Sequence, residues 1–166
     1  MNIIFRVNGK PATAGSKRGF PVRRKDGSVG VAMAPDNVRA RPWMAAVADE
    51  ASKHATEVSY QPISLLLTFY FCRPKSHFKT RKGVRTLKES APAFKTGKPD
   101  CTKLARAVED ALTGIVWKDD SQIVGHHVYK TWGEQEGVFV HVMELEEQEQ
   151  GKTNSDLLSR NTKGTE

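Results

Sequence analysis

Apolar side chains at every second position mark the first strand of this chain. Ile3, Phe5 and Val7 alternate with other, mostly polar residues, which is the pattern of a strand with one buried face. The following segment, 12–28, is rich in Gly, Ser, Lys and Arg, so we expect a basic loop there. A short strand is predicted over 28–33.

Two helices are predicted from apolar residues that recur three and four positions apart. Trp43, Val47 and Ala51 share one face of a helix expected over 39–56, which the Asp-Asn pair at 36–37 would cap. A second helix is expected from Asp100 to Thr113, because Gly114 ends it. Its apolar face follows the spacing i, i+4, i+7, i+8 and consists of Leu104, Val108, Ala111 and Leu112. Its second face is polar and consists of Thr102, Arg106, Glu109 and Asp110.

Between these helices, the longest apolar run gives way abruptly to a basic segment. Residues 63–72 predict a strand at the centre of a sheet. Residues 73–99 then carry nine Lys and Arg with interleaved His and Phe, and we expect an unstructured insert. An insert of that length has two interpretations. It is either an arm that binds DNA through its cations and aromatic rings, or a solvated loop without a function.

The last strands are predicted over 123–132 and 138–145, joined by 133–137 as a hairpin. Beyond residue 146 the chain is polar and low in aromatic residues, which predicts disorder. The order β(β)αβαββ indicates a single α+β domain with a mixed sheet and two main helices. We therefore expect a domain over 1–145, with the basic insert at 73–98, and a tail over 146–166.

Composition narrows the class of protein without fixing it. The 166 residues have a mean hydropathy of −0.53 and no apolar run long enough to cross a membrane, so we expect a cytoplasmic protein. Two cysteines are too few for a disulfide framework. The net charge of +7 is uneven: residues 1–130 hold 23 Lys and Arg against 11 Asp and Glu, and the remainder hold 3 against 8. A basic body of this kind favours a polyanionic partner.

Acidic residues are scarce in this basic body, yet five of them fall within 100–120. Carboxylates brought together raise one another's pKa unless a cation binds between them. Hard oxygen ligands suit Mg²⁺ or Mn²⁺, and phosphodiester hydrolysis uses such a metal to activate water and to offset charge on the phosphate. A structural acid cluster, in which each carboxylate serves as a charge partner, is the alternative reading.

The order of residues in this region resembles that of a known family. Residues 98–114 read Lys-Pro-Asp-Cys-Thr-Lys-Leu-Ala-Arg-Ala-Val-Glu-Asp-Ala-Leu-Thr-Gly, and 117–124 read Trp-Lys-Asp-Asp-Ser-Gln-Ile-Val. This is similar to the RusA-family Holliday junction resolvases, often encoded by bacteriophages and prophages. Their pattern is Pro-Asp-x-Asp-Asn-Leu-x-Lys, then Asp-Ala-Leu, then Asp-Asp-x-Gln after an apolar residue.

The resemblance implies roles for several residues. Asp100 and Asp120 match the acidic metal ligands, with Mg²⁺ as the cofactor, Mn²⁺ as a substitute and no organic cofactor. Arg106 stands where the family has a lysine that assists at the phosphate. Asp119 is a weaker catalytic candidate, because neighbours on a strand point to opposite faces. Asp110 is either a further ligand or an i, i+4 partner for Arg106.

The sequence departs from the family pattern at two positions. Thr102 stands where the family has its second aspartate, and Lys103 replaces the asparagine. Two readings follow. Either a metal is held by Asp100 and Asp120 with extra water, or the site is weakened and the protein binds branched DNA without cutting it efficiently.

The implied function is a structure-specific endonuclease that resolves four-way junctions in DNA recombination and repair. A homodimer is expected, because a two-fold junction needs paired nicks. The residues expected to hold DNA are basic and belong to the 12–28 loop, the insert and the start of the second helix: Lys17, Arg18, Arg23, Arg24, Arg73, Lys75, Lys79, Arg81, Lys82, Lys98 and Lys103. A small basic DNA- or RNA-binding regulator is a rival, but neither a helix-turn-helix nor an aromatic RNA-binding motif is evident.

Overall fold

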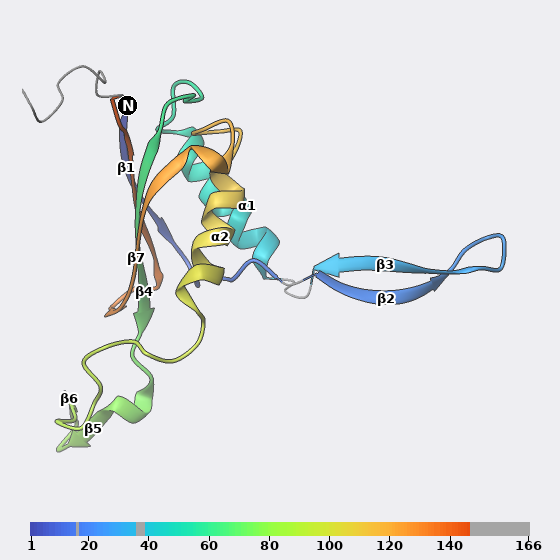
Figure 1. The fold of residues 1–166 in the computed structure, drawn as a ribbon. Coiled ribbons are helices and arrows are strands. Elements are labelled where there is room, and N and C mark those ends of the chain that lie inside the picture. The colour runs from blue at the N-terminus through green and yellow to red at the C-terminus, as the bar shows by residue number, and fades with distance from the viewer. Residues whose placement is uncertain (16, 36–38, 147–166) are drawn as a thin grey trace, which may run out of the picture.

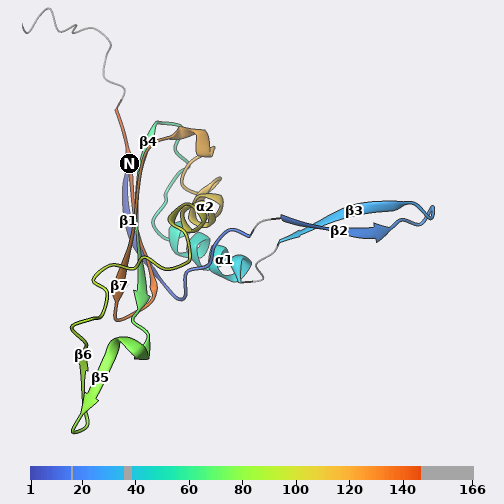
Figure 2. The same cartoon turned by 60° about the horizontal axis from the view of Figure 1, so that its bottom comes forward.

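A four-stranded mixed sheet with both helices on one face forms the body of the protein (Figures 1 and 2). The computed structural model describes residues 1–15, 17–35 and 39–146. In spatial order the strands are β1 (Asn2–Asn8), β8 (Gly137–Glu144), β4 (Ile63–Cys72) and β7 (Ile123–Gly133). Strand β4 is antiparallel to β8 and parallel to β7. The α+β class, the mixed sheet and the two helices predicted from the sequence are confirmed.

The core lies between the sheet and the two helices, α1 (Ala40–Ser52) and α2 (Cys101–Leu112). Side chains at alternate positions of β1, β4 and β8 are buried against the helices, as alternation predicts. The apolar faces predicted for both helices are buried as well. Helix α1 ends at Ser52, shorter than expected, and the expected cap at 36–37 lies outside the described residues.

The prediction that the last two strands form a hairpin is wrong. Strands β7 and β8 are not paired, because β4 lies between them and pairs with both. Residues 134–136 instead pass the end of β4, where Cys72 Sγ donates to the carbonyl of Glu134 at 3.1 Å. The most apolar strand, β4, takes one of the two inner positions, where both of its edges find partners. A short connection in the sequence could not reveal a strand inserted from elsewhere in the chain.

The prediction of a basic loop over 12–28 is also partly wrong. Strands β2 (Lys17–Arg23) and β3 (Val29–Pro35) pair as an antiparallel hairpin that projects from the body (Figure 1). Its turn is fixed by Asp26, whose Oδ1 accepts the backbone N–H and the hydroxyl of Ser28 at 2.9 and 2.7 Å. Gly27 supplies a positive φ of 84°.

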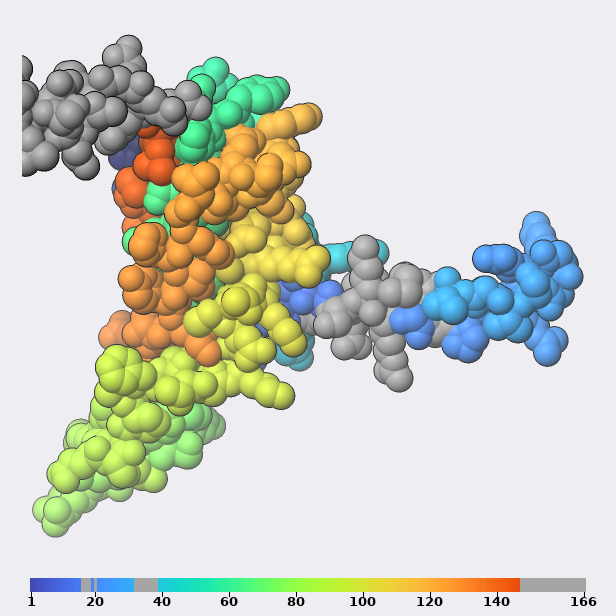
Figure 3. Space-filling view, viewed as in Figure 1, coloured from blue at the N-terminus to red at the C-terminus, as the bar shows by residue number. Residues whose placement is uncertain are grey.

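The insert expected to be unstructured contains a second projecting hairpin. A 3-10 turn, η1 (Lys75–His77), leads into β5 (Phe78–Arg81) and β6 (Val84–Leu87). Lys82 and Gly83 join the strands with φ of 50° and 77°, the two positive values that a tight hairpin turn requires. In the space-filling view this hairpin protrudes at one end of the molecule (Figure 3). A last 3-10 turn, η2 (Asp120–Gln122), precedes β7.

Two features expected from the sequence remain: the C-terminal tail and the absence of a membrane span. The predicted disordered tail lies outside the described residues, apart from residue 146. Among the helices in the described ranges, none is long and apolar enough to cross a membrane.

Candidate functional site

Helix α2 presents a polar face at the surface of the body. Thr102, Arg106 and Asp110 are exposed on it, as their helical spacing predicts. The ion pair expected between Arg106 and Asp110 is not among those that the described residues form. Arg106 is exposed, and its positive charge acts on Glu109.

The side chain of Asp120 accepts hydrogen bonds from two uncharged donors. The indole Nε1 of Trp117 donates to Asp120 Oδ1 at 3.1 Å, and the hydroxyl of Thr113 donates to the same oxygen. Trp117 is fully buried, so the core fixes its indole. Asp120 itself is exposed. The fold thus fixes one carboxylate at the surface beside the carboxyl end of α2.

Asp119 has a structural role in the turn. Its Oδ1 accepts the backbone N–H of Ser121 at 2.9 Å, and the side-chain oxygen of Gln122 accepts the backbone N–H of Asp119 at 2.9 Å. Together these bonds form a capping box on η2. Hydrogen bonds from the side chain and backbone of Ser121 lower the pKa of Asp119. In Asp-Asp-x-Gln, the first aspartate and the glutamine build the turn that presents Asp120.

Glu109 is a functional candidate that sequence reasoning did not single out. It lies one turn before Thr113 on α2, and its side chain is only 19% exposed. Burial raises the pKa of Glu109, and the negative charge of Asp120 raises it further. His126 Nε2 lies 3.0 Å from Glu109 Oε1, outside hydrogen-bonding geometry. Burial lowers the pKa of His126, and the neighbouring charge of His127 lowers it further.

Asp100 stands at the other end of α2. It occupies the N-cap position without a side-chain capping bond, and its carboxylate is 58% exposed. Lys103 Nζ lies 3.8 Å from Asp100 Oδ2. The preceding segment is anchored by Lys130, whose Nζ donates to the carbonyls of Gly97 and Pro99 at 3.0 and 2.7 Å. Asp100 thus has a fixed backbone and a cationic neighbour.

The two expected metal ligands do not come together in one chain. The twelve residues of α2 span about 18 Å at 1.5 Å per residue. Asp100 precedes that span, and Asp120 is bonded to Thr113 directly after it. Two oxygens on one Mg²⁺ each lie at about 2.1 Å from it. In the described part of the chain, no three His, Cys, Asp or Glu side chains group to hold a metal ion. Asp100 and Asp120 therefore do not fit a shared ion within one chain.

Comparison with known proteins places the chain in a family. The family of Endodeoxyribonuclease RusA matches residues 11–143. The chain belongs to the RusA family. A curated relative, the uncharacterized protein YqaN of Bacillus subtilis (strain 168), is 31% identical over 144 residues, which cover 86% of this chain and 96% of that protein. RusA-family nucleases act on branched DNA and generally depend on a divalent metal.

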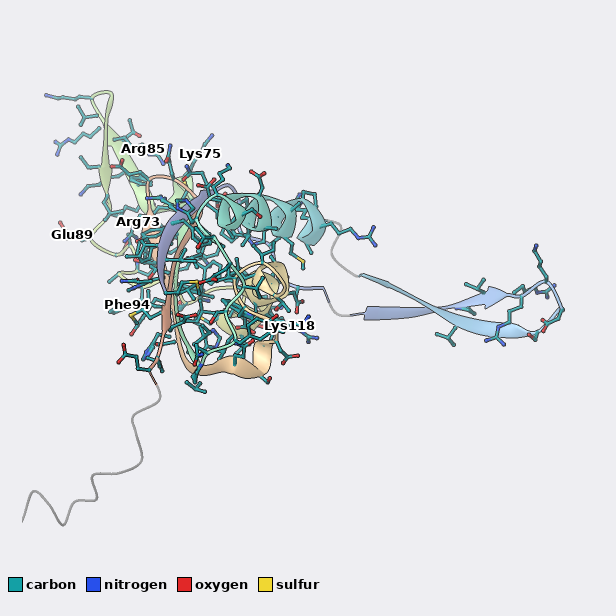
Figure 4. The ribbon with its side chains drawn as sticks, turned by 90° about the horizontal axis from the view of Figure 1, so that it is seen from above. Arg73, Lys75, Arg85, Glu89, Phe94 and Lys118 are labelled. Atoms are coloured by element: carbon teal, nitrogen blue, oxygen red, sulfur yellow. The ribbon has the colours of Figure 1, made fainter. Side chains whose placement is uncertain are left out.

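The basic residues expected to hold DNA in this RusA-family protein are spread over several surfaces. Lys79, Arg81 and Lys82 are exposed on the β5–β6 hairpin, and Lys75 and half-buried Arg73 stand at its base (Figure 4). Three further groups are exposed elsewhere: Arg23 and Arg24 at the tip of the β2–β3 hairpin, Lys98 before α2, and Lys103 on it. Lys17 and Arg18 lie in β2.

Proposed function

We propose that this RusA-family protein is an endonuclease that cuts branched DNA, four-way junctions in particular. The proposal includes Mg²⁺ or Mn²⁺ as the cofactor and a homodimer as the active form. A four-way junction is two-fold symmetric, so a symmetric dimer offers one site to each of two strands.

The observation that carries the proposal is the fixed and exposed carboxylate of Asp120. Trp117 and Thr113 hold it by hydrogen bonds, and no ion pair to Asp120 is found within the described ranges. An exposed carboxylate without a Lys or Arg partner, in a chain of net charge +7, is available to a cation or to a water molecule.

The neighbouring residues support chemistry at a phosphate. Arg106 is exposed one turn before Glu109, and a guanidinium contacts two phosphate oxygens at once. Glu109 and Asp120 are close enough for their charges to interact. A divalent metal would supply charge neutralisation at the phosphate. Because Asp100 and Asp120 do not fit one ion within a chain, we assign no ligand set.

A second candidate is a branched-DNA-binding protein that does not cut. Three observations favour it: Asp100 and Asp120 lie at opposite ends of α2, Thr102 is neutral, and Lys103 lies beside Asp100. Under this alternative, the fold and the basic hairpins would bind junctions, but the site would not cut DNA.

A nicking assay separates the two candidates. The substrates are a synthetic four-way junction and a matched linear duplex, each with Mg²⁺ or EDTA. We expect metal-dependent, symmetric cuts on the junction alone, and a loss of about 100-fold or more in Asp120→Asn. Asp49→Asn, an exposed aspartate on α1, serves as the matched control and should cut at the wild-type rate.

Each outcome decides a specific claim. Junction binding without cuts by any variant would establish the non-cleaving candidate. Cutting that survives in both Asp100→Asn and Asp120→Asn would exclude these aspartates from the chemistry. Loss in Asp120→Asn alone would locate the chemistry at the carboxyl end of α2.

A further inference from the structure

Three arginines each lie over an aromatic ring near the end of the sheet where β1, β4 and β7 finish, with Tyr70 and Trp132 on opposite faces of the sheet. The guanidinium carbons are within 5.1 Å of the ring centroids in the pairs Arg85–Phe78 (3.8 Å), Arg6–Tyr70 (4.9 Å) and Arg73–Trp132 (5.1 Å). The members of these pairs come from the β5–β6 hairpin, the sheet and the segment that joins them. Cation–π pairs of this kind are ordinary singly, and here three of them occur near one end of the sheet.

The three pairs line two adjoining hollows. A hollow of about 630 Å³ is lined by the Arg85–Phe78 and Arg73–Trp132 pairs, and a second of about 350 Å³ by Arg6 and Tyr70. Both hollows share Gly133 and Glu134, so they meet at the loop between β7 and β8. We call this combined surface the arginine–aromatic groove.

The groove is separate from the acidic residues of α2. It lies where β4 and β7 end, whereas Asp120 precedes the start of β7. The eleven residues of β7 span about 36 Å at 3.3 Å per residue. Neither hollow includes an aspartate, and the one carboxylate that lines them is that of Glu134.

The chemistry of the groove matches an unpaired nucleic-acid strand. Arginines attract phosphates, and bases stack on the faces of aromatic rings and of guanidinium groups. Base faces are hidden inside a duplex, so aromatic platforms select strands in which bases are unstacked. Each hollow is within the roughly 300–1,000 Å³ range of small-ligand pockets, which accommodates a base. Figure 4 shows Arg73 and Arg85 on the same side of the molecule, beside the hairpin.

We propose that the arginine–aromatic groove binds a short unpaired segment of single-stranded DNA and thereby favours branched over linear DNA. The choice of DNA rests on the proposed function, but binding in the groove needs neither the metal nor the carboxylates of α2. Tyr70 and Phe78 act as stacking platforms. Arg6 and Arg85 hold the flanking phosphates.

The test is binding in EDTA, so that nuclease activity plays no part. A fluorescein-labelled 12-mer of oligothymidylate and a linear duplex of equal length are titrated by fluorescence anisotropy. We expect Tyr70→Leu and Phe78→Leu each to weaken single-strand binding by about 10-fold and duplex binding by less than about 2-fold. Tyr60→Leu replaces a tyrosine that is 73% exposed outside the groove, and it should bind like the wild type.

Charge and fold are tested separately. Arg6→Gln keeps the sheet and removes one cation, so it should weaken single-strand binding and lower its salt dependence by about one unit of slope. If Phe78→Leu disturbs the hairpin, Tyr70→Leu and Arg6→Gln still test the groove, because both residues stand on strands of the main sheet and not on the hairpin. Thermal unfolding checks that each variant is folded.

Three results would overturn the proposal: single-strand affinity unchanged in Tyr70→Leu, equal losses on single strand and duplex, or tighter binding of an RNA 12-mer than of its DNA counterpart. Loss of nicking with intact oligothymidylate binding would instead refute the proposed nuclease function and leave the groove standing.

Discussion

At the scale of single residues, the tryptophan before the Asp-Asp pair connects the core to the site. Trp117 is fully buried, and its ring packs among core side chains of the sheet and helices. Its indole N–H reaches Asp120 Oδ1 and Thr113 Oγ1, at 3.1 and 3.2 Å. In the sequence, Trp117 is recognisable only as the apolar residue that precedes the Asp-Asp pair in the family pattern. The structure adds that the same ring positions the candidate carboxylate.

Replacing Trp117 by Phe therefore tests this positioning. The ring remains apolar, but the hydrogen bond to a charged group is lost, which is worth about 1.5–3 kcal/mol. If that bond acts in the reaction, the nicking rate on a four-way junction should fall by about 10- to 100-fold. Trp43→Phe is the matched control, because Trp43 is also buried and its Nε1 has no hydrogen-bond partner. Equal activity losses in both variants would show that Trp117 acts through packing and not through its hydrogen bond.

At the scale of elements, turn chemistry decides which basic segments are ordered. Lys82 and Gly83 occupy the two left-handed positions of the β5–β6 turn. The amide of Lys88 then donates to the carbonyl of His77 at 2.9 Å, beyond the ends of the two strands. Two short exposed strands have little core to stabilise them, so the turn controls the hairpin.

Gly83→Ala should loosen this hairpin without unfolding the body. A side chain at φ 77° is strained even in open space, at a cost of about 1 kcal/mol. Amide hydrogen exchange over 78–87 should accelerate about 5-fold, while the melting temperature of the body stays the same. Gly83→Asn should have a smaller effect, because asparagine tolerates the left-handed region. Unchanged exchange in Gly83→Ala would show that contacts with the body hold the hairpin instead.

At the scale of the whole molecule, two hairpins carry positive charge outward, while the acidic residues of the candidate site stay on the body. The β2–β3 and β5–β6 hairpins project from different parts of the body (Figures 1 and 2). A four-way junction presents several phosphate backbones at once, and separated basic projections contact more of them than a compact surface does.

Salt dependence measures this contribution. Binding to a junction in EDTA should weaken steeply with salt, and the double variant Lys79→Gln/Lys82→Gln should reduce the slope of log K against log salt by roughly 2. The control removes the same charge from exposed Lys10 and Arg41, which lie outside both hairpins. A slope that falls equally in the control would assign the effect to net charge alone.

The sequence by itself determined the local features and the family. Alternation and helical spacing predicted the central strands and the buried faces of both helices, because burial on one side imposes a period on the sequence. The motif from Asp100 to Gln122 indicated the RusA family, to which the chain belongs. The motif could not distinguish Asp119, which builds its turn, from Asp120, which the turn presents.

Only the tertiary structure decided how these parts are placed. The sheet inserts β4 between β7 and β8, and α2 holds Asp100 and Asp120 at its opposite ends. The fold also brings Arg6 and Tyr70 into the same groove as Arg85 and Phe78. These relations join residues far apart in the chain. A periodic pattern records which side of an element is buried, but it carries no information about which distant element covers it.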